Sequence, residues 1–435
     1  MNYQLKTLSV LTITLLSLAA CSKEKPLDNS VQVGPNPELP KAEDFLIPPM
    51  QVPKYAGWAA DALPKVTADL KIEKIADGFL HPRQLYTLSN GDVLVVESNG
   101  PGEEATTTPK QLIASKVKGI SGKGAPGGNR VTLLRQNASG SWDKHILLEK
   151  LHSPFGISVI GNELFVANTN NVMKFPFTVG QTKITAPGVE LADLPDRINH
   201  HWTKSMVASP DGTKLYVGVG SNSNIGENGL EAEYRRATVL EIDAKTGASR
   251  VYSSGVRNPT GLQIEPTTGK VWAIANERDE IGASLVPDYL TSLQDGGFYG
   301  WPYSYYGQHL DTRVKEQRPD LVAKAIKPDY ALGSHVAPLG LWFYSGTGLP
   351  AKYNGGAFVS NHGSWDRSPL NGYDVVFIKF ENGKPVGQPT PIVTGFYSDD
   401  ESKLYGAPVG LTQDKSGALL IADDVGNIVW RVSTK

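Results

Sequence analysis

The sequence repeats one hairpin pattern six times, and this repetition constrains the fold more than any other feature. In each copy, a Pro or polar cluster precedes a short apolar strand, a turn, a second apolar strand and a polar loop. The copies span residues 81–98, 153–170, 201–222, 257–279, 336–367 and 407–424. Their turns carry residue pairs that tight hairpins favour, namely Asn90-Gly91, Gly161-Asn162, Asp211-Gly212, Thr268-Gly269, Asn354-Gly355 and Ser416-Gly417.

Further β-like sequence follows each copy, for example Thr238 to Ile242 and Tyr373 to Phe380. Each repeat therefore reads as a four-stranded blade, and six copies predict an all-β, six-bladed β-propeller. A β-sandwich of six hairpins is the alternative, but it would not need the same flanking signals every time. Insertions fall at residues 99–130 and at residues 282–335, the second being rich in tyrosine.

The N-terminus has the features of an export signal. Lys6 precedes an apolar stretch, and Leu18-Ala19-Ala20-Cys21 matches a bacterial lipobox. We therefore predict a signal peptide over residues 1–20 and lipidation of Cys21. Ser22 rather than Asp follows the cysteine, which favours the outer over the inner membrane. The prediction is a lipid-anchored protein of the bacterial periplasm.

Residues 21–55 would then comprise the lipidated cysteine and a Pro-rich, polar, flexible tether. Residues 56–435 would form the propeller domain. Cys21 is the only cysteine in the chain, so stability must come from packing rather than from disulfides. The formal net charge of −2 offers no basic footprint for nucleic acid.

Polar and charged residues gather where the repeats begin and end. The inner strand of every propeller blade lines the central channel, so residues that flank the repeats should converge at one mouth. Six of the eight histidines occupy such positions, which are His81, His152, His200, His201, His335 and His362. Arg257, Asn258, Arg367 and the run from Asn276 to Asp279 do so too. Such a gathering predicts an active site.

The residue types indicate the chemistry. A neutral His201 would act as a general base, while Arg257 and Arg367 would bind an anion such as a carboxylate. The acidic loop 276–280 offers oxygen ligands for a hard cation such as calcium. Each feature also has a structural reading, because a lone histidine often caps a strand, Arg257-Asn258-Pro259 suits a turn, and a charged loop can simply be solvated.

Several motifs, in this order, resemble one family. HHW at 200–202, SPDG at 209–212, SGVRNPTGL at 254–262, ANERDE at 275–280, GGFYGWPY at 296–303, HVAP at 335–338 and NHGSWDRS at 361–368 look like the pyrroloquinoline quinone (PQQ)-dependent sugar dehydrogenases. The L-sorbosone dehydrogenase branch is the most similar, and the resemblance runs from about residue 70 to the C-terminus. It implies a six-bladed propeller that holds PQQ and calcium at its mouth and oxidises an aldose or a hydrated aldehyde.

The resemblance also implies roles for individual residues. His201 matches the catalytic base, and Arg257 with Asn258 matches the pair beside the quinone, where Arg257 would stabilise charge during reduction. His152 and His335 fall at positions that line the cofactor. Backbone carbonyls at the positions of Glu277 and Arg278 bind calcium in that family. The role of His200 is not settled, because glucose enzymes carry an acid there.

Two departures from the family pattern concern cofactor binding. The lysine that grips the quinone in glucose enzymes has no clear equivalent, although His362 and Arg367 lie in the corresponding loop. Ala407 stands where the family commonly has an arginine before Pro-Val-Gly. One anion-binding group is therefore missing from the last repeat.

Three functions follow from these patterns. The first is a PQQ-dependent dehydrogenase of a sugar or aldehyde, with electrons leaving to a separate cytochrome or quinone because Cys21 leaves no haem attachment motif. The second is a calcium-dependent, lactonase-type hydrolase, which would need acidic side chains at the axis. The third is a non-catalytic propeller that binds partners at the cell surface.

Overall fold

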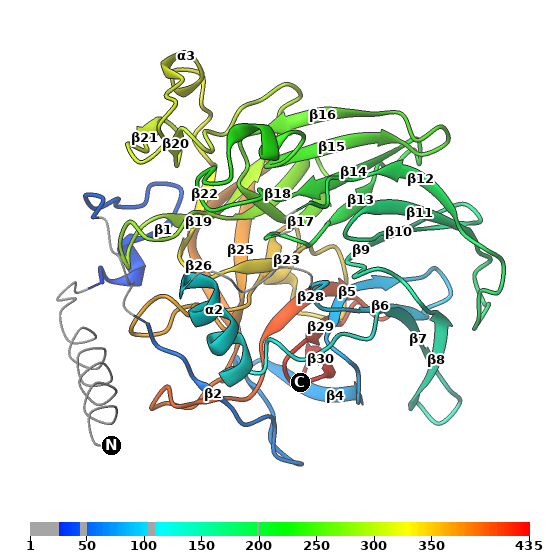
Figure 1. The fold of residues 1–435 in the computed structure, drawn as a ribbon. Coiled ribbons are helices and arrows are strands. Elements are labelled where there is room, and N and C mark those ends of the chain that lie inside the picture. The colour runs from blue at the N-terminus through cyan, green and yellow to red at the C-terminus, as the bar shows by residue number, and fades with distance from the viewer. Residues whose placement is uncertain (1–25, 44–49, 103–108, 198–199) are drawn as a thin grey trace, which may run out of the picture.

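Six antiparallel sheets surround a central axis in the computed structural model (Figure 1). The structure describes residues 26–43, 50–102, 109–197 and 200–435, so the predicted signal peptide and Cys21 lie outside the described residues. Each sheet contains one of the six predicted hairpins as its first two strands. The prediction of a six-bladed β-propeller is confirmed.

The strands of each blade follow one another from the axis outward. Blade one comprises β5 (Pro82–Thr87), β6 (Val93–Glu97), β7 (Arg130–Gln136) and β8 (Trp142–Leu148). Blade two comprises β9 (Gly156–Ile160), β10 (Glu163–Ala167), β11 (Asn171–Pro176) and β12 (Val189–Asp193). Blade three comprises β13 (Met206–Ala208), β14 (Lys214–Val219), β15 (Thr238–Asp243) and β16 (Ser249–Ser254).

Two of the remaining blades gain a fifth strand from the N-terminal part of the chain. Blade four comprises β17 (Asn258–Ile264), β18 (Val271–Asn276), β19 (Pro287–Ser292) and β22 (Tyr330–Ser334), with β1 (Val33–Gly34) added at its edge. Blade five comprises β23 (Pro338–Phe343), β24 (Ala357–Asn361), β25 (Asp374–Glu381) and β26 (Lys384–Thr394), with β3 (Lys65–Val66) at its edge.

Blade six closes the ring by joining the two ends of the domain. Its strands β28 (Pro408–Gln413), β29 (Leu419–Asp423) and β30 (Ile428–Thr434) come from the C-terminus, and its outer strand is β4 (Leu70–Asp77). The pairing of β30 with β4 runs from Ile428–Asp77 to Thr434–Leu70 (Figure 1). Hydrogen bonds between distant parts of the chain therefore hold the circle shut.

The hydrophobic core is divided into six clusters, one at each junction between neighbouring blades. Between blades one and two, for example, Leu94 and Val96 pack against Ile157, Leu164 and Val166. Every residue of β6 is buried, because a blade sandwiched between two others covers both faces of its strands. This is why the inner strands are continuous apolar runs rather than alternating ones.

Neighbouring inner strands approach so closely that some positions accept only glycine. A Cβ on Gly340 of β23 would overlap the carbonyl oxygen of Val409 and the hydroxyl of Ser360, and one on Gly410 of β28 would overlap the carbonyl of Arg83. Both contacts join one blade to the next around the axis. The absence of a side chain at these positions lets the inner strands of neighbouring blades approach each other.

We expect Gly340→Ala to destabilise the protein by about 1–3 kcal/mol, because inserting a methyl group there forces two blades apart. Denaturant unfolding measures the change. Gly119→Ala is the control, since a Cβ at this exposed glycine meets nothing within 4 Å and helix propensity makes it neutral or favourable by up to about 1 kcal/mol. Equal stability of the two variants would contradict the close approach.

The described part of the predicted tether packs against the propeller and so differs from a free linker. β1 pairs with β22, and β2 (Lys54–Tyr55) pairs in parallel with β27 (Lys403–Leu404). Gln32 is fully buried, and its amide donates to the carbonyl of Ser284 at 2.6 Å. The segment is held mainly by polar contacts to distant residues, which its Pro-rich composition does not reveal.

The two predicted insertions differ in nature. Within 99–130 lies α2 (Pro109–Ile120), which is drawn in cyan in Figure 1. The segment 282–335 is only partly an insertion, because β19 and β22 belong to blade four. Between them lie β20 (Ser304–Tyr305), β21 (His309–Leu310) and α3 (Pro319–Val322).

Three short 3-10 turns, η1 (Asn29–Val31), η2 (Leu230–Glu233) and η3 (Ala351–Tyr353), complete the elements. Among the described residues, the helices are too short and too polar to span a bilayer.

Candidate active site at the mouth of the channel

The two ends of every inner hairpin lie side by side, which brings the flanking residues to one face. The register pairs Pro82 with Glu97, Asn258 with Asn276 and Pro338 with Asn361. The six inner strands surround the axis in the same direction, so the residues before each first strand and after each second strand share one mouth of the channel. The predicted site residues of the six repeats are therefore on the same end of the propeller.

His201 is held as a neutral ring with a defined tautomer. Its Nδ1 lies 2.9 Å from the carbonyl oxygen of Ser221 and 3.0 Å from the Ser221 hydroxyl. Since a carbonyl can only accept, Nδ1 carries the proton and Nε2 carries the lone pair. Burial, then the charges of Arg257 and His200, hold the pKa of His201 well below its ordinary value near 6.5. Nε2 is thus able to accept a proton at neutral pH.

His200 contacts the candidate base through its ring. The two imidazole centroids are 4.6 Å apart in an edge-to-face arrangement. Behind His201, a Cβ on Gly220 would overlap both the His201 Cβ and the Asn258 side chain. Gly220, the residue after β14, therefore lets His201 and Asn258 approach each other.

Arg257 is 2% exposed and is fixed by four hydrogen bonds. It donates to the carbonyl of Asn224 at 3.2 Å, to the Asn224 side chain at 2.9 Å, to the carbonyl of Glu277 at 2.5 Å and to Asp279 at 3.3 Å. The neighbouring Asn258 donates to Asn276 at 3.2 Å. The guanidinium is therefore rigid, beside His201 and electrostatically coupled to it.

Glu277 and Arg278, whose backbone carbonyls are predicted to bind calcium, make other contacts in the structure. The Glu277 carbonyl already accepts from Arg257, and the buried Arg278 guanidinium turns toward the segment between β19 and β22. There it donates to Asp311 at 2.9 Å and to the carbonyls of Pro302 and Ser304. The side chain of Arg278 thus anchors that insertion.

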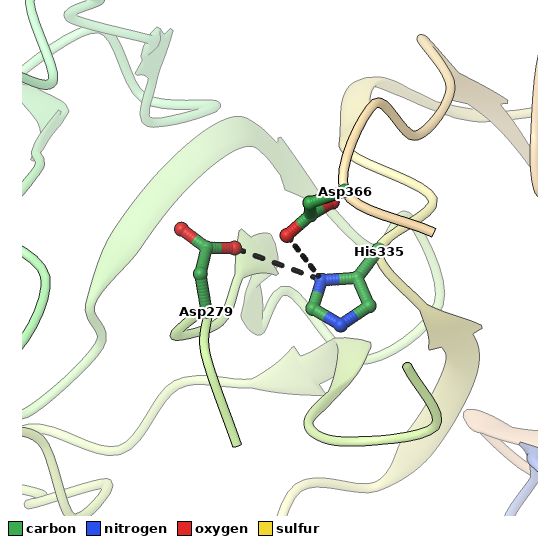
Figure 2. Close-up of side chains that lie close together, drawn as sticks. All are labelled: Asp279, His335 and Asp366. Carbon is green, nitrogen blue, oxygen red and sulfur yellow. Dashed lines mark ion pairs between the residues drawn. The ribbon is translucent and has the colours of Figure 1, made fainter. Parts of the chain in front are cut away.

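Next to Arg257 lies a cluster of one histidine and two aspartates (Figure 2). His335 Nδ1 is 3.2 Å from Asp366 Oδ2 and 3.6 Å from Asp279 Oδ1. Burial alone lowers the pKa of His335, but Asp366 and Asp279 outweigh it and raise the pKa to about 10. Burial raises the pKa of Asp366, whereas Arg257 and His335 overcome burial and hold the pKa of Asp279 below its ordinary value.

A second charged group joins blades one, five and six. The buried Asp424 is 2.9 Å from His362 Nε2 and 2.8 Å from Arg83. Burial lowers the pKa of His362 to about 4 despite Asp424. The Arg83 guanidinium also lies 5.3 Å from the centre of the Trp202 ring, which connects this group to the His201 side of the mouth.

Lys123, just beyond α2, reaches this second group. Its Nζ lies 3.3–3.5 Å from the Tyr373 hydroxyl and from the carbonyls of His362 and Gly363. It also sits 4.7 Å from the centre of the Tyr373 ring. Burial lowers the pKa of Lys123 to about 8, so the lysine is charged at neutral pH. Its hydrogen bonds are long, so the side chain is held only weakly.

Two further predicted residues lie at the rim. His152 Nδ1 is 3.1 Å from Asn170 Oδ1. The Arg367 guanidinium is 2% exposed and donates to Gln32, Ala283, Leu27 and Asn29. Arg367 therefore fixes the N-terminal segment in this structure, and its binding of a cofactor carboxylate stays a prediction.

The structure brings in residues that the sequence reasoning missed. Arg83, Lys123 and Asp366 all contact predicted site residues, and the buried Lys204 donates to the carbonyl of Trp202 at 3.1 Å. Arg83 and Lys204 could have been found, because each lies within three residues of a repeat's opening histidine. Lys123 gave no such signal, since it sits in an insertion. Arg83 also pairs with Asp424, whose backbone N–H donates to the carbonyl of Ala407. A guanidinium from blade one therefore lies near the position where the last repeat lacks its own arginine.

Several buried acceptors at the mouth receive no hydrogen bond from the described residues. They are the side-chain oxygens Asn168 Oδ1, Asn258 Oδ1, Asn361 Oδ1 and Asp366 Oδ2. A buried acceptor left without a donor costs about 1–3 kcal/mol. Four of them at the ends of three inner hairpins therefore indicate a site built to receive donors, such as water or hydroxyl groups, or a cation.

Comparison with known proteins agrees with this architecture. Residues 161–367 match the family model described as glucose/sorbosone dehydrogenase, and residues 306–435 match a TrAA12-like model. An uncharacterized protein from Borreliella burgdorferi is 25% identical over 299 residues, covering 66% of this chain and 77% of that protein.

Solved structures share the fold at lower identity. The holo form of the PQQ domain of a pyranose dehydrogenase from Coprinopsis cinerea superposes with a TM-score of 0.67 at 19% identity, covering 88% of this chain and all of that one. A calcium structure of a family AA12 enzyme from Trichoderma reesei gives a TM-score of 0.68 at 18% identity, covering 86% and 97%. The resemblance predicted from the motifs is confirmed without singling out the sorbosone branch, and residues 161–367 of this chain are similar to the glucose/sorbosone dehydrogenases.

Proposed function

We propose that this chain is a PQQ-dependent oxidoreductase that oxidises an aldose or a sugar-derived aldehyde at the mouth of its channel. The observation that carries the proposal is the neutral His201, with its Nε2 lone pair set by the bond from Nδ1 to Ser221 and with Arg257 beside it. The match to the glucose/sorbosone dehydrogenase model and the fold shared with a PQQ-binding domain support it.

The charges at the mouth fit an anionic cofactor with several carboxylates. Arg83, Lys204, Arg257 and Arg367 are nearly fully buried, and Lys123 joins them. Asp424 pairs with Arg83 and Asp279 pairs with Arg257, and a bound polyanion would add to this compensation of buried charge. The three arginines and Lys123 would hold PQQ. When bound, the quinone supplies the acceptor for the hydride that leaves the substrate carbon.

Calcium fits the predicted position less well. Glu277 was expected to offer its carbonyl oxygen to the ion, but that oxygen accepts a hydrogen bond from Arg257 at 2.5 Å. A cation next to a guanidinium that shares the same oxygen is unfavourable. No step of the proposed reaction therefore rests on calcium.

His201 would take the hydroxyl proton of the substrate on Nε2. The Ser221 carbonyl, which accepts from Nδ1–H, would then stabilise the imidazolium that forms. The unpaired oxygens of Asn168, Asn258 and Asn361 would accept hydrogen bonds from the other hydroxyl groups of a sugar. An acceptor-rich mouth suits a polyhydroxylated substrate better than an apolar one.

The test is reconstitution of the purified protein with PQQ, with and without Ca²⁺, followed by dye reduction over a panel of aldoses, aldehydes and a lactone. Saturable quinone binding and turnover of an aldose or aldehyde are the expected result. Absence of quinone binding would exclude the dehydrogenase, and lactone hydrolysis without quinone would point to the hydrolase instead.

The export prediction belongs to the same proposal. We propose that the chain is cleaved before Cys21, lipidated there and held in the periplasm, so that electrons pass to a separate cytochrome or quinone. The lipobox at Leu18 to Cys21 supports this. Mass spectrometry of the mature N-terminal peptide should show a diacylglyceryl group on Cys21, and an unprocessed Met1 would contradict it.

The pH dependence of kcat/KM should report the pKa of His201 in the free enzyme. Because that pKa is lowered, the base stays unprotonated as the pH falls through 6.5, and activity is lost only at lower pH. We expect the midpoint of the acid limb below 6.5. A midpoint at or above 6.5 would show that His201 is not held in its neutral form.

We expect Lys123→Gln to weaken PQQ binding by about tenfold, because one charge-assisted hydrogen bond is lost. Wild-type affinity should also fall as the pH rises past about 8, where Lys123 loses its proton. Fluorescence titration with the quinone measures both effects. Lys116→Gln, on the exposed side of α2, is the matched control, and equal weakening in both variants would show that general charge alone is at work.

A further inference from the structure

We propose that Asp279, His335 and Asp366 form a binding site for a divalent transition-metal ion of the zinc class. The argument for this site does not use the proposed quinone reaction, although Asp279 also pairs with Arg257 and His335 falls at a position predicted to line the cofactor. It also differs from the predicted calcium position, because the ligands are three side chains rather than backbone carbonyls. The three donor atoms lie within 4.8 Å of one another (Figure 2).

The first argument is the orientation of His335. Its Nε2 lies 3.0 Å from the carbonyl oxygen of Gly282, which can only accept, so Nε2 carries a proton. Nδ1 is then the nitrogen that faces Asp279 and Asp366. A histidine that donates its outer N–H to a backbone carbonyl and directs the other nitrogen at carboxylates has the arrangement of a metal ligand.

The second argument is the unsatisfied carboxylate. Asp366 is 3% exposed, and its Oδ2 accepts no hydrogen bond within the described part of the chain, although it points toward His335 Nδ1 at 3.2 Å. A single proton on Nδ1 can be directed at only one oxygen. An ion between the three groups can be shared by all of them.

The distances and donor types select the class of ion. In a tetrahedral site with bonds of about 2.0–2.1 Å, neighbouring ligand atoms are about 3.3 Å apart. The separations of 3.2 and 3.6 Å from Nδ1 to the two carboxylate oxygens are close to this value. Imidazole nitrogen favours zinc and its neighbours over calcium, which takes oxygen ligands.

The site has support and an access route. Asp279 would bind through Oδ1 while its Oδ2 keeps the 3.3 Å ion pair with Arg257. The side chain of Asp279 is 29% exposed, so an ion can enter from the mouth and a fourth position stays open to water. Asp279 follows β18, whereas His335 and Asp366 flank the first hairpin of blade five. The ion would therefore join blades four and five.

The test is zinc binding by the purified full chain without quinone, measured by calorimetry, by metal analysis after dialysis and by thermal unfolding. We expect one bound equivalent and a rise in Tm of about 3–5 °C at zinc a hundredfold above Kd. Asp366→Asn should weaken zinc binding by more than about a hundredfold, because losing even a hydrogen-bond partner of a metal ligand lowers metal affinity by about 10–100-fold. Asp374→Asn, another carboxylate of blade five, which bonds to Asn361 at 2.8 Å, should leave binding unchanged.

The competing arrangement is a His335 imidazolium between two carboxylates with no ion. Zinc binding that is absent, or equal in wild type and Asp366→Asn, would overturn the proposal. If Asp366→Asn fails to fold, the test is the visible absorption spectrum of the wild-type protein titrated with Co²⁺. Absorption bands of tetrahedral Co²⁺ that reach their maximum at one equivalent support the proposal, and the spectrum of hydrated Co²⁺ alone overturns it.

Discussion

Replacing His201 by glutamine is expected to lower kcat of the quinone-loaded protein by about 10²–10⁴-fold, the usual contribution of a general base. The glutamine amide can still donate to the Ser221 carbonyl that now accepts from Nδ1, so the surrounding structure should be kept. What is lost is the Nε2 lone pair. Steady-state dye reduction measures kcat, and fluorescence titration measures quinone binding separately.

His145→Gln is the matched control, because His145 lies on β8, the outermost strand of blade one, far from the axis. This variant should keep full activity. The assignment of His201 as the base requires that quinone affinity change little while kcat falls. A His201→Gln enzyme with wild-type kcat would show that another group accepts the proton.

The largest expected loss of stability comes from Asp423→Ala, at about 3–5 kcal/mol. This fully buried carboxylate accepts four N–H groups. Oδ1 accepts from Ala407 and Gly426, both at 2.8 Å, and Oδ2 accepts from the indoles of Trp58 at 2.7 Å and Trp430 at 3.1 Å. Removing it leaves four donors without a partner and frees the segment that carries Trp58 from blade six.

Asp400→Ala is the control for burial. Asp400 also accepts several hydrogen bonds, from Ser398 and from the backbone and hydroxyl of Ser402, but in an exposed turn. Water replaces the lost hydrogen bonds there, so we expect a much smaller loss of stability than for Asp423→Ala. Chemical unfolding of both variants gives the comparison, and similar losses would mean that burial does not set the cost at Asp423.

The blades could be predicted because their signal is local. A turn pair such as Asp211-Gly212 and the apolar runs on either side depend on neighbours in sequence, and the six recurrences fix the number of blades. The role of β4 was not predicted, because a strand that closes the ring pairs with β30 more than 300 residues away, and nothing in its own residues names that partner.

The predicted tether shows the opposite case. Its composition is that of a linker, yet Gln32 is fixed by hydrogen bonds to Ser284 and Arg367. These contacts are hydrogen bonds to single distant groups rather than a stripe of apolar residues. A pattern read along the chain detects periodic burial, and it cannot detect isolated polar anchors of this kind.

By itself, the sequence determined the repeat, the mouth at which its polar ends gather, and the choice of His201 and Arg257. Only the tertiary structure decided how those groups are used. It keeps His201 neutral through burial and the nearby charges of Arg257 and His200, while Ser221 sets the tautomer. It also occupies the Glu277 carbonyl with Arg257 and places Asp366 beside His335. The physical reason is that protonation and ligand geometry depend on neighbours within a few ångströms in space, which the closing of the ring brings together from different blades.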